Sequence, residues 1–356
     1  MKEKIITFIF MSFITIMFIL GIIIPDKEIS YSERRILSKF PKITLKSLLD
    51  TSFKENFEKY TTDQIIFREN LKKISTNFSY KILRNTDNNG YFKKDNHIFK
   101  TLYPLNEKNI ETNINKINKI INEKLTNNNV YFITVPDKNY YLNDNTYLKI
   151  DYDHFFKKIK DNINANHIDI TKKLSLNDYY KTDPHWKQEN LINLANYIIK
   201  GLNNDVQNIN YKKITIGTLN GSYTNSNIKT SPDNLTYLEN DILNTAYVNY
   251  IENNNFNKIY NIEKSKGIDP YDLFLSGANT IIEITNTNTF NNKELIIFRD
   301  SFASSLAPLL VPYYKKITLI DTRYIHPSLL NNYITFDNQD VLFIYSTLIL
   351  NENILK

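Results

Sequence analysis

Short, uninterrupted apolar runs alternate with amphipathic stretches from about residue 91 onward, and this alternation restricts the fold more than any other sequence feature. Five Ile and Leu residues within 110–125 recur in steps of three or four, which predicts one face of a helix. The run VYFITV at 130–135 predicts a strand buried on both faces. Such an alternation favours an α/β fold with a parallel sheet covered on both sides by helices. Further strands are expected at 167–170, 280–284, 294–298, 317–320 and 341–345, and further helices at 152–163 and 187–202.

The remaining segments suggest how the chain is organised. Residues 28–90 are charged and helical in texture, which predicts a stalk and an N-terminal helical segment. We expect residues 91–356 to form one α/β domain. Within this domain, residues 203–266 are polar, Asn-rich and only weakly alternating, so we interpret them as an insertion or a β-rich excursion.

Residues 5–24 form a run of 20 uncharged, mostly apolar residues between two lysines and Pro25. At 1.5 Å per residue the run is about 30 Å long as a helix, the hydrocarbon thickness of a bilayer. No small-x-small cleavage site follows it. We therefore expect residues 1–27 to be a single-pass anchor in the cell membrane, with the lysines inside and the rest of the chain extracytoplasmic. A signal peptide cleaved near Ser30 is the alternative.

Composition excludes several kinds of site. The chain has no Cys, so any nucleophile must be Ser, Thr, Lys or a carboxylate. Its 7 Gly form no phosphate-binding loop, and a net charge of +6 without a basic block predicts no nucleic-acid partner. We expect no metal and no cofactor, since the remaining histidines lack metal-like spacing with carboxylates: His97, His154, His167 and His326.

Two motifs more than a hundred residues apart carry the candidate catalytic groups. In the segment IFRDSF (297–302), Ser301 lies between a predicted strand and a predicted helix. Open α/β sheets bind ligands outside the carboxyl ends of their strands, and free N–H groups there can stabilise an oxyanion. A serine hydroxyl becomes a nucleophile when a base takes its proton and a third group orients the base. Asp183 and His185 are such a pair.

The segment KTDPHW (181–186) has a structural interpretation as well. Asp183 could cap the helix expected from about Lys187, with His185 packed beneath it, and this interpretation is the better one for an isolated Asp-x-His. The combination of this Asp-x-His motif with an Asp-Ser pair at a strand end favours the catalytic interpretation instead. Pro184 disfavours a helical Asp183, and the single tryptophan, Trp186, is expected to wall the pocket.

Together these motifs resemble a known family. The pattern Thr-Asp-x-His-Trp at 182–186, followed by Asp-Ser-Phe at 300–302, is similar to the SGNH-hydrolase-like group that includes the alginate O-acetyltransferases. It most closely resembles the bacterial family named for its DHHW motif. The other stretches similar to that family are 33–35, 63–68, 135–138, 271–279 and 321–324.

The resemblance implies a flavodoxin-like, three-layer α/β/α domain with Ser301 as nucleophile, His185 as general base and Asp183 as its orienting group. It also implies Asn279 as a second oxyanion donor, although a loop asparagine is an equal alternative. Arg299 stands where the wider superfamily has Gly, so it either crowds the oxyanion site or supplies charge to it. Strand-end cations are candidates for contact with an anionic or sugar ligand, or are ordinary surface charges: Lys138 and Arg323.

The leading hypothesis is a membrane-anchored, extracytoplasmic O-acyltransferase or acetylesterase acting on cell-envelope polysaccharide. The resemblance implies a membrane-bound O-acyltransferase partner that delivers acetyl groups outward. A surface polysaccharide-binding or assembly protein that keeps the fold without turnover is the alternative, favoured by Arg299. A soluble cytoplasmic lipase-like enzyme ranks third because of the expected anchor.

Overall fold

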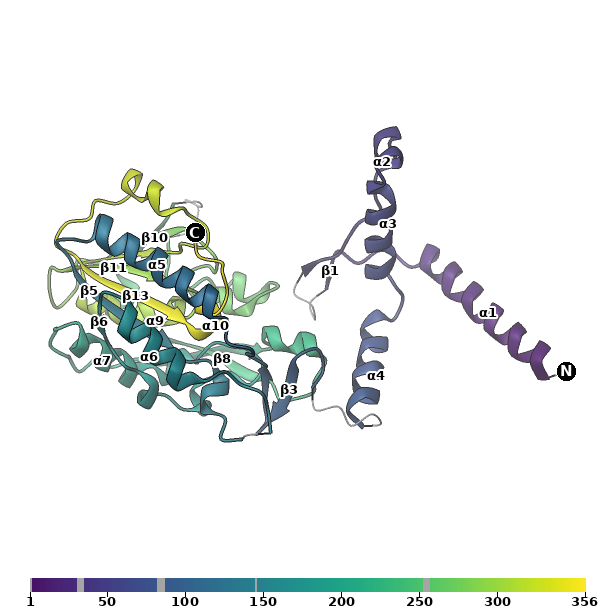
Figure 1. Ribbon diagram of the computed structural model, residues 1–356, viewed down its shortest axis with the longest axis horizontal. Coiled ribbons are helices and arrows are strands. Elements are labelled where there is room, and N and C mark those ends of the chain that lie inside the picture. Colours follow the sequence, from purple (N-terminus) through teal and green to yellow (C-terminus); the bar gives the residue numbers. More distant parts are fainter. Residues whose placement is uncertain (1, 31–34, 82–86, 145, 252–256) are drawn as a thin grey trace. The chain divides into compact units, whose positions relative to one another are not determined.

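The computed structural model describes residues 2–30, 35–81, 87–144, 146–251 and 257–356 (Figure 1). The chain forms two compact units. Residues 1–89 with 224–229 make the first, called here the N-terminal unit, and residues 90–223 with 230–356 make the second, called the α/β unit.

A seven-stranded sheet with the order β6-β5-β13-β11-β12-β10-β9 is the centre of the α/β unit. Its first five strands are mutually parallel, whereas β10 is antiparallel to both of its neighbours. The predicted α/β fold is confirmed, and the sheet that we expected to be parallel is mostly so, with β10 as the exception. The strands are β5 (Asn129–Val135), β6 (Asn166–His167), β9 (Tyr247–Tyr250), β10 (Ile281–Thr285), β11 (Glu294–Arg299), β12 (Lys316–Ile320) and β13 (Asp340–Ser346).

Helices cover both faces of this sheet. On one face, α5 (Glu107–Lys124) and α6 (Tyr152–Asn162) pack on alternate strand residues such as Phe298. On the other, α7 (Ile192–Gly201) and α9 (Ala303–Leu310) pack on the residues between them, such as Ile297. The strands are therefore apolar on both sides, which is why their sequences are continuous apolar runs.

The strand order places one strand end at a special position. If β11, β12, β13, β5 and β6 are numbered 1 to 5, the parallel strands lie in the spatial order 2-1-3-4-5. This is the order of a common doubly wound sheet, except that here the chain begins at strand 4 of the count. The first two strands in this count are connected toward one side, and the third lies on the other side of the first. The carboxyl end of β11 is therefore the topological switch point, where such sheets bind ligands.

Smaller elements surround the sheet. Two antiparallel hairpins pair β3 with β4 and β7 with β8, and the second hairpin lies within the Asn-rich region. The bounds are β3 (Tyr91–Lys94), β4 (His97–Lys100), β7 (Lys212–Leu219), β8 (Asp233–Glu239), α8 (Asp241–Asn244) and α10 (Thr347–Leu350).

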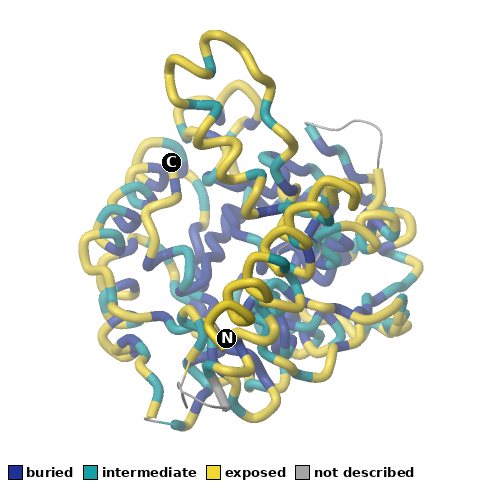
Figure 2. Tube along the Cα trace, turned by 90° about the vertical axis from the view of Figure 1, so that its right-hand side faces the viewer, coloured by how far each residue is buried: buried dark blue, intermediate teal, exposed yellow. Residues whose placement is uncertain are grey.

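The N-terminal unit begins with α1 (Lys2–Ile23), which is exposed along its length (Figure 2). Among the described residues it is the one helix long and apolar enough to cross a membrane. The rest of the unit consists of β1 (Ile29–Ser30), β2 (Arg35–Ile36), α2 (Leu45–Leu49), α3 (Ser52–Asp63) and α4 (Arg68–Lys81).

An ion pair links two distant segments of this unit. The Arg35 guanidinium donates two hydrogen bonds to the Asp63 carboxylate, at 2.8 and 2.5 Å, and holds the pKa of Asp63 well below its usual range. The pair joins two of the stretches noted for their resemblance, 33–35 and 63–68. Glu33 and Arg34 themselves lie outside the described residues.

Candidate active site

Ser301 lies in the turn between β11 and α9 and is half-buried. The fully buried Asp300 fixes this turn. Its Oδ1 accepts a hydrogen bond from the Phe302 N–H at 3.0 Å, and its Oδ2 accepts one from the Ser346 N–H at 2.7 Å, at the end of the neighbouring strand β13. The position of Ser301 is therefore set by two strands and the start of a helix.

The structure brings together the three residues proposed as a triad. The distance from Ser301 Oγ to His185 Nε2 is 2.7 Å, and that from His185 Nδ1 to Asp183 Oδ1 is 2.5 Å. The carboxylate acts as acceptor for Nδ1–H, so we assign the neutral tautomer whose Nε2 is free to accept the serine proton. Asp183 is 1% exposed and the His185 side chain 12%, so both groups are largely shielded from solvent.

His185 lies in a tight turn, residues 179–186, whose two ends are bonded to each other. Tyr179 and Trp186 form an antiparallel bridge, and the His185 carbonyl accepts a hydrogen bond from the Tyr180 N–H at 3.0 Å. Trp186 is fully buried, and its indole N–H contacts Phe302 O at 3.0 Å and Ser305 Oγ at 2.9 Å. We expected Trp186 to wall the pocket; it instead supports the start of α9 from within the core.

Asp183 has a second set of partners that sequence reasoning missed. Its Oδ2 accepts hydrogen bonds from the Ser222 N–H at 2.8 Å and the Ser222 hydroxyl at 3.1 Å. The preceding residue, Gly221, lies so close that a Cβ there would be 2.2 Å from Thr182 O. The only signal in the sequence is a Gly-Ser pair in a chain with 7 Gly. The Asn-rich region thus contributes to the site.

Tyr271 is the second residue that we did not single out. Its ring is stacked on that of His185, with centroids 3.9 Å apart and planes 9° from parallel. Its hydroxyl is 2.8 Å from Ser305 Oγ, and burial raises its pKa, so the phenol stays neutral. Tyr271 therefore fixes the imidazole plane without adding charge.

Arg299 is 1% exposed and lies beneath the turn rather than in open space. Its guanidinium donates to Ser304 Oγ at 2.7 Å and makes longer contacts of 3.5 Å with the carbonyl oxygens of Asp300 and Asn279. Among the described residues no carboxylate lies within ion-pair distance of it, and burial lowers its pKa. Because Asp300 O belongs to the peptide that carries the Ser301 N–H, this cation polarises that donor.

The Asn279 amide points into its own loop. Its Nδ2 contacts the carbonyl oxygens of Leu275 at 3.2 Å and of Ser276 and Gly277 at 3.4 Å. Those three residues all have positive φ angles, of 51°, 55° and 78°, so the amide closes a tight left-handed loop. The Ser301 N–H, in contrast, has no acceptor within the described part of the chain.

The two strand-end cations lie apart from the triad contacts. Lys138 is 2% exposed, and its ammonium donates to Ile98 O at 2.6 Å, Tyr180 O at 3.0 Å and Lys181 O at 3.3 Å. It therefore supports the segment just before Asp183, and burial lowers its pKa to about 7. Arg323 binds Asp321 through Nε at 2.9 Å and an Nη at 2.6 Å. Within the described ranges no cluster of His, Asp or Glu could hold a metal ion.

The fold is similar to those of several solved structures. A DHHW family protein from Eubacterium siraeum matches with a TM-score of 0.59 at 22% identity, over 74% of this chain and 93% of that one. Bacillus cereus PatB1 matches with a TM-score of 0.57 at 18% identity, over 75% and 98%, and PatB1 with a sulfonyl adduct matches with 0.56. The O-acetyltransferase domain of Pseudomonas putida AlgJ has a TM-score of 0.44 at 12% identity, over 74% and 92%.

No protein-family model and no curated protein sequence matches the chain. The resemblance inferred from the motifs is thus confirmed at the level of the fold.

Proposed function

We propose that this protein is an extracytoplasmic, membrane-anchored O-acyltransferase or esterase that moves acetyl groups on cell-envelope polysaccharide. The observation that carries the proposal is the hydrogen-bonded chain from Ser301 through His185 to Asp183, at 2.7 and 2.5 Å. A serine in this arrangement is an activated nucleophile for acyl transfer.

In the first half-reaction, Ser301 Oγ attacks the carbonyl carbon of an acetyl donor while His185 Nε2 takes the hydroxyl proton. Asp183 stabilises the imidazolium that forms. The negative charge on the carbonyl oxygen is stabilised by the Ser301 N–H, whose peptide Arg299 polarises. The bond to the donor oxygen then breaks, the leaving alcohol takes the proton from His185, and an acetyl-serine ester remains.

In the second half-reaction, a sugar hydroxyl attacks the acetyl-serine ester. His185 takes the proton of this hydroxyl, the ester bond to Ser301 Oγ breaks, and the proton returns to Ser301. A transferase results when the acceptor is a sugar hydroxyl, and an esterase when it is water. The resemblance to the DHHW-motif family supports a polysaccharide acceptor and a membrane-bound O-acyltransferase partner that supplies acetyl groups.

The N-terminal helix supports the proposed location. As a helix of 22 residues α1 is about 33 Å long, enough to cross the hydrocarbon core, and none of its residues is buried against the protein. We propose that it is a single-pass anchor rather than a cleaved signal sequence.

A polysaccharide-binding or assembly protein without turnover is the second candidate. The observation that favours it is the oxyanion side of the site, where the Asn279 amide is directed at loop carbonyls. A site that offers one backbone donor would stabilise a tetrahedral intermediate less than one with several.

Hydrolysis of an activated acetyl ester separates the two candidates. We expect the full-length protein in detergent to hydrolyse 4-nitrophenyl acetate and to react with a phenylmethylsulfonyl reagent, because PatB1 has a structure with a sulfonyl adduct. Ser301→Ala should lower turnover by several orders of magnitude and abolish sulfonylation. Ser328→Ala, which removes an exposed serine hydroxyl, is the matched control and should do neither. Glycan binding by a parent protein no more active than Ser301→Ala would establish the second candidate.

A further inference from the structure

We infer that the turn joining α3 to α4, residues 64–67, lies in the outer interface of the lipid bilayer beside the end of α1. The partner is the phospholipid surface itself. The inference rests on the proposed anchoring by α1, because that helix places the N-terminal unit at the membrane.

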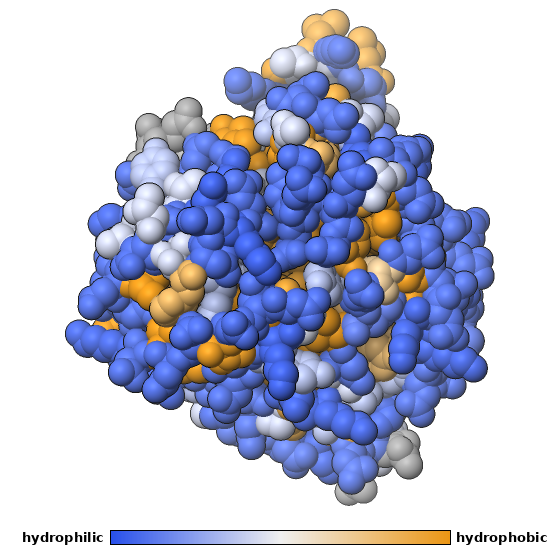
Figure 3. Space-filling view, turned by 90° about the vertical axis from the view of Figure 1, so that its left-hand side faces the viewer, coloured by the Kyte–Doolittle hydropathy of each residue, from blue (hydrophilic) through white to orange (hydrophobic). Residues whose placement is uncertain are grey.

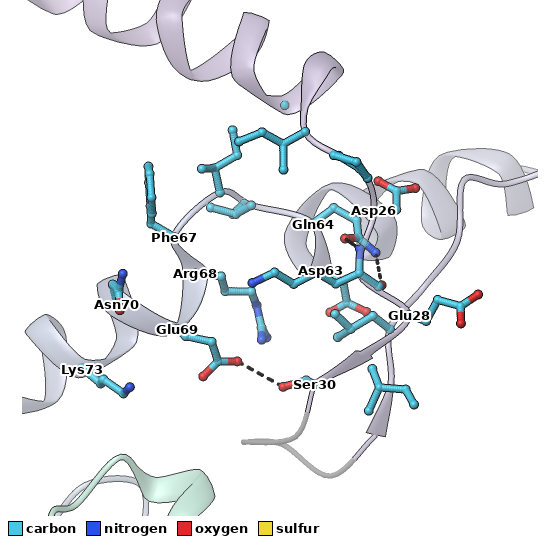
Figure 4. Close-up of a pocket in the computed structure, with 18 residues that line it drawn as sticks. Asp26, Glu28, Ser30, Asp63, Gln64, Phe67, Arg68, Glu69, Asn70 and Lys73 are labelled. Carbon is cyan, nitrogen blue, oxygen red and sulfur yellow. Dashed lines mark hydrogen bonds between the residues drawn. The ribbon is translucent and has the colours of Figure 1, made fainter. Parts of the chain in front are cut away.

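A pocket of about 830 Å³ within the N-terminal unit is lined both by the end of α1 and by the turn, so the two lie side by side (Figure 4). One side of its lining comes from Gly21, Ile24 and Pro25 at the end of α1, and another from Ile65 and Phe67 in the turn. A 22-residue helix matches the hydrocarbon core, so the end of α1 lies at the core boundary. Residues that line the same pocket therefore lie at the depth of the lipid headgroups.

The turn exposes large apolar side chains at this depth. Ile65 is 47% exposed and Phe67 is 59% exposed. Phe67 has a φ of 57°, a conformation that is uncommon for a bulky residue. In Figure 4 its ring points to the side of the pocket on which α1 lies, away from the hydrogen bond between Glu69 and Ser30. An exposed aromatic ring held in a strained conformation is explained if the ring is placed among lipids.

Charged residues of both signs line the pocket. Of its four carboxylates, Glu28 pairs with Lys39 at 2.9 Å and Asp63 pairs with Arg35 at 2.8 Å. The other two accept hydrogen bonds from hydroxyls, Asp26 from Tyr60 at 3.0 Å and Glu69 from Ser30 at 3.1 Å. The ammonium groups of Lys27 and Lys73 also line the pocket, and neither has a partner within the described residues. Lysine side chains near the end of a spanning helix can reach the headgroup region, and exposed aromatic rings are enriched at the same depth.

The α/β unit provides a contrast. Its face seen in Figure 3 is mostly hydrophilic, with small and separate apolar areas. Leu329, in this unit, is 48% exposed, similar to Ile65, and it does not adjoin α1 in sequence or in the pocket. It therefore serves as a control for exposure alone.

The absence of native cysteine allows a direct test with one label per chain. We would make Phe67→Cys, Ile65→Cys, Leu329→Cys and Phe13→Cys in the full-length protein, attach an environment-sensitive fluorophore and reconstitute each variant in vesicles containing anionic phosphatidylglycerol. Nitroxide lipids labelled near the headgroup or deep in the acyl chain then quench fluorophores at their own depth.

We expect headgroup-level nitroxide to quench the labels at 65 and 67 at least threefold more than the label at 329, and deep nitroxide to quench the label at 13. Quenching at 13 with labels at 65 and 67 no more quenched than at 329 would overturn the inference and leave the anchor intact. Lack of quenching at 13 would overturn both the anchor and this inference.

Discussion

Removing the hydroxyl of Ser222 tests whether the Asn-rich region positions Asp183, the carboxylate of the proposed triad. In Ser222→Ala, Asp183 Oδ2 loses the 3.1 Å hydrogen bond from the hydroxyl and keeps the 2.8 Å bond from the Ser222 N–H. Asp183 Oδ1 keeps its contacts with His185. A hydrogen bond to a charged group contributes about 1.5–3 kcal/mol, and this one is long, so we expect a loss of about 1.5 kcal/mol, or roughly tenfold in kcat/KM.

The assay is hydrolysis of 4-nitrophenyl acetate by parent, Ser222→Ala and Ser222→Thr, with urea unfolding of each measured in parallel. A positioning role lowers kcat in the fully folded protein, whereas a purely structural role lowers only the free energy of unfolding. Ser222→Thr restores the hydroxyl and should restore most of the activity. Ser222 has no positioning role if Ser222→Ala stays within twofold of the parent, or if Ser222→Thr is no more active than Ser222→Ala.

Three further outcomes can be measured on the same protein. Asp183→Asn should lower kcat about 10⁴-fold, because the amide presents the wrong partner to His185; activity within tenfold of the parent would exclude the triad. Deleting residues 1–27 should move the protein from the membrane fraction to the soluble fraction, and a soluble full-length chain would contradict the anchor. Burial lowers the pKa of Lys138 to about 7, against about 10.4 in an unfolded chain, so the unfolded state binds more protons between these values. The free energy of unfolding should thus rise from pH 7 toward pH 10, and Lys138→Met should remove that part of the slope in denaturant titrations.

The elements of the α/β unit could be predicted because burial on both faces leaves a direct trace in the sequence. The run expected at 130–135 is β5 (Asn129–Val135), and the run expected at 341–345 is β13 (Asp340–Ser346). Periodicity reports which faces are buried and not which strands are neighbours. Periodicity therefore could not predict that β13 lies between β5 and β11 or that β10 is antiparallel to its neighbours.

Part of the candidate site could be proposed from the sequence for a different reason. Asp183 and His185 are two residues apart, so their contact is local and the motif carries it. The partner of Asp183 on its other oxygen, Ser222, is 39 residues away, and no pattern links the two. The sequence also does not predict the direction of a side chain. A cation at a strand end, such as Lys138, can point to solvent or, as here, inward to backbone carbonyls.

Strand β13 lies between β5 and β11 in the sheet and follows both of them in the order of synthesis. Its partners β5 and β11 each present an open edge until it arrives, and its pairing with β5 joins residues more than 200 positions apart. Such non-local pairing folds slowly, and open edges invite association with other chains. For a chain exported as we propose, the nucleophile turn lacks its Ser346 contact until β13 has left the translocation channel. A protein exported in this way would complete its sheet only once its final strand is delivered, and the edges of β5 and β11 would stay open until then.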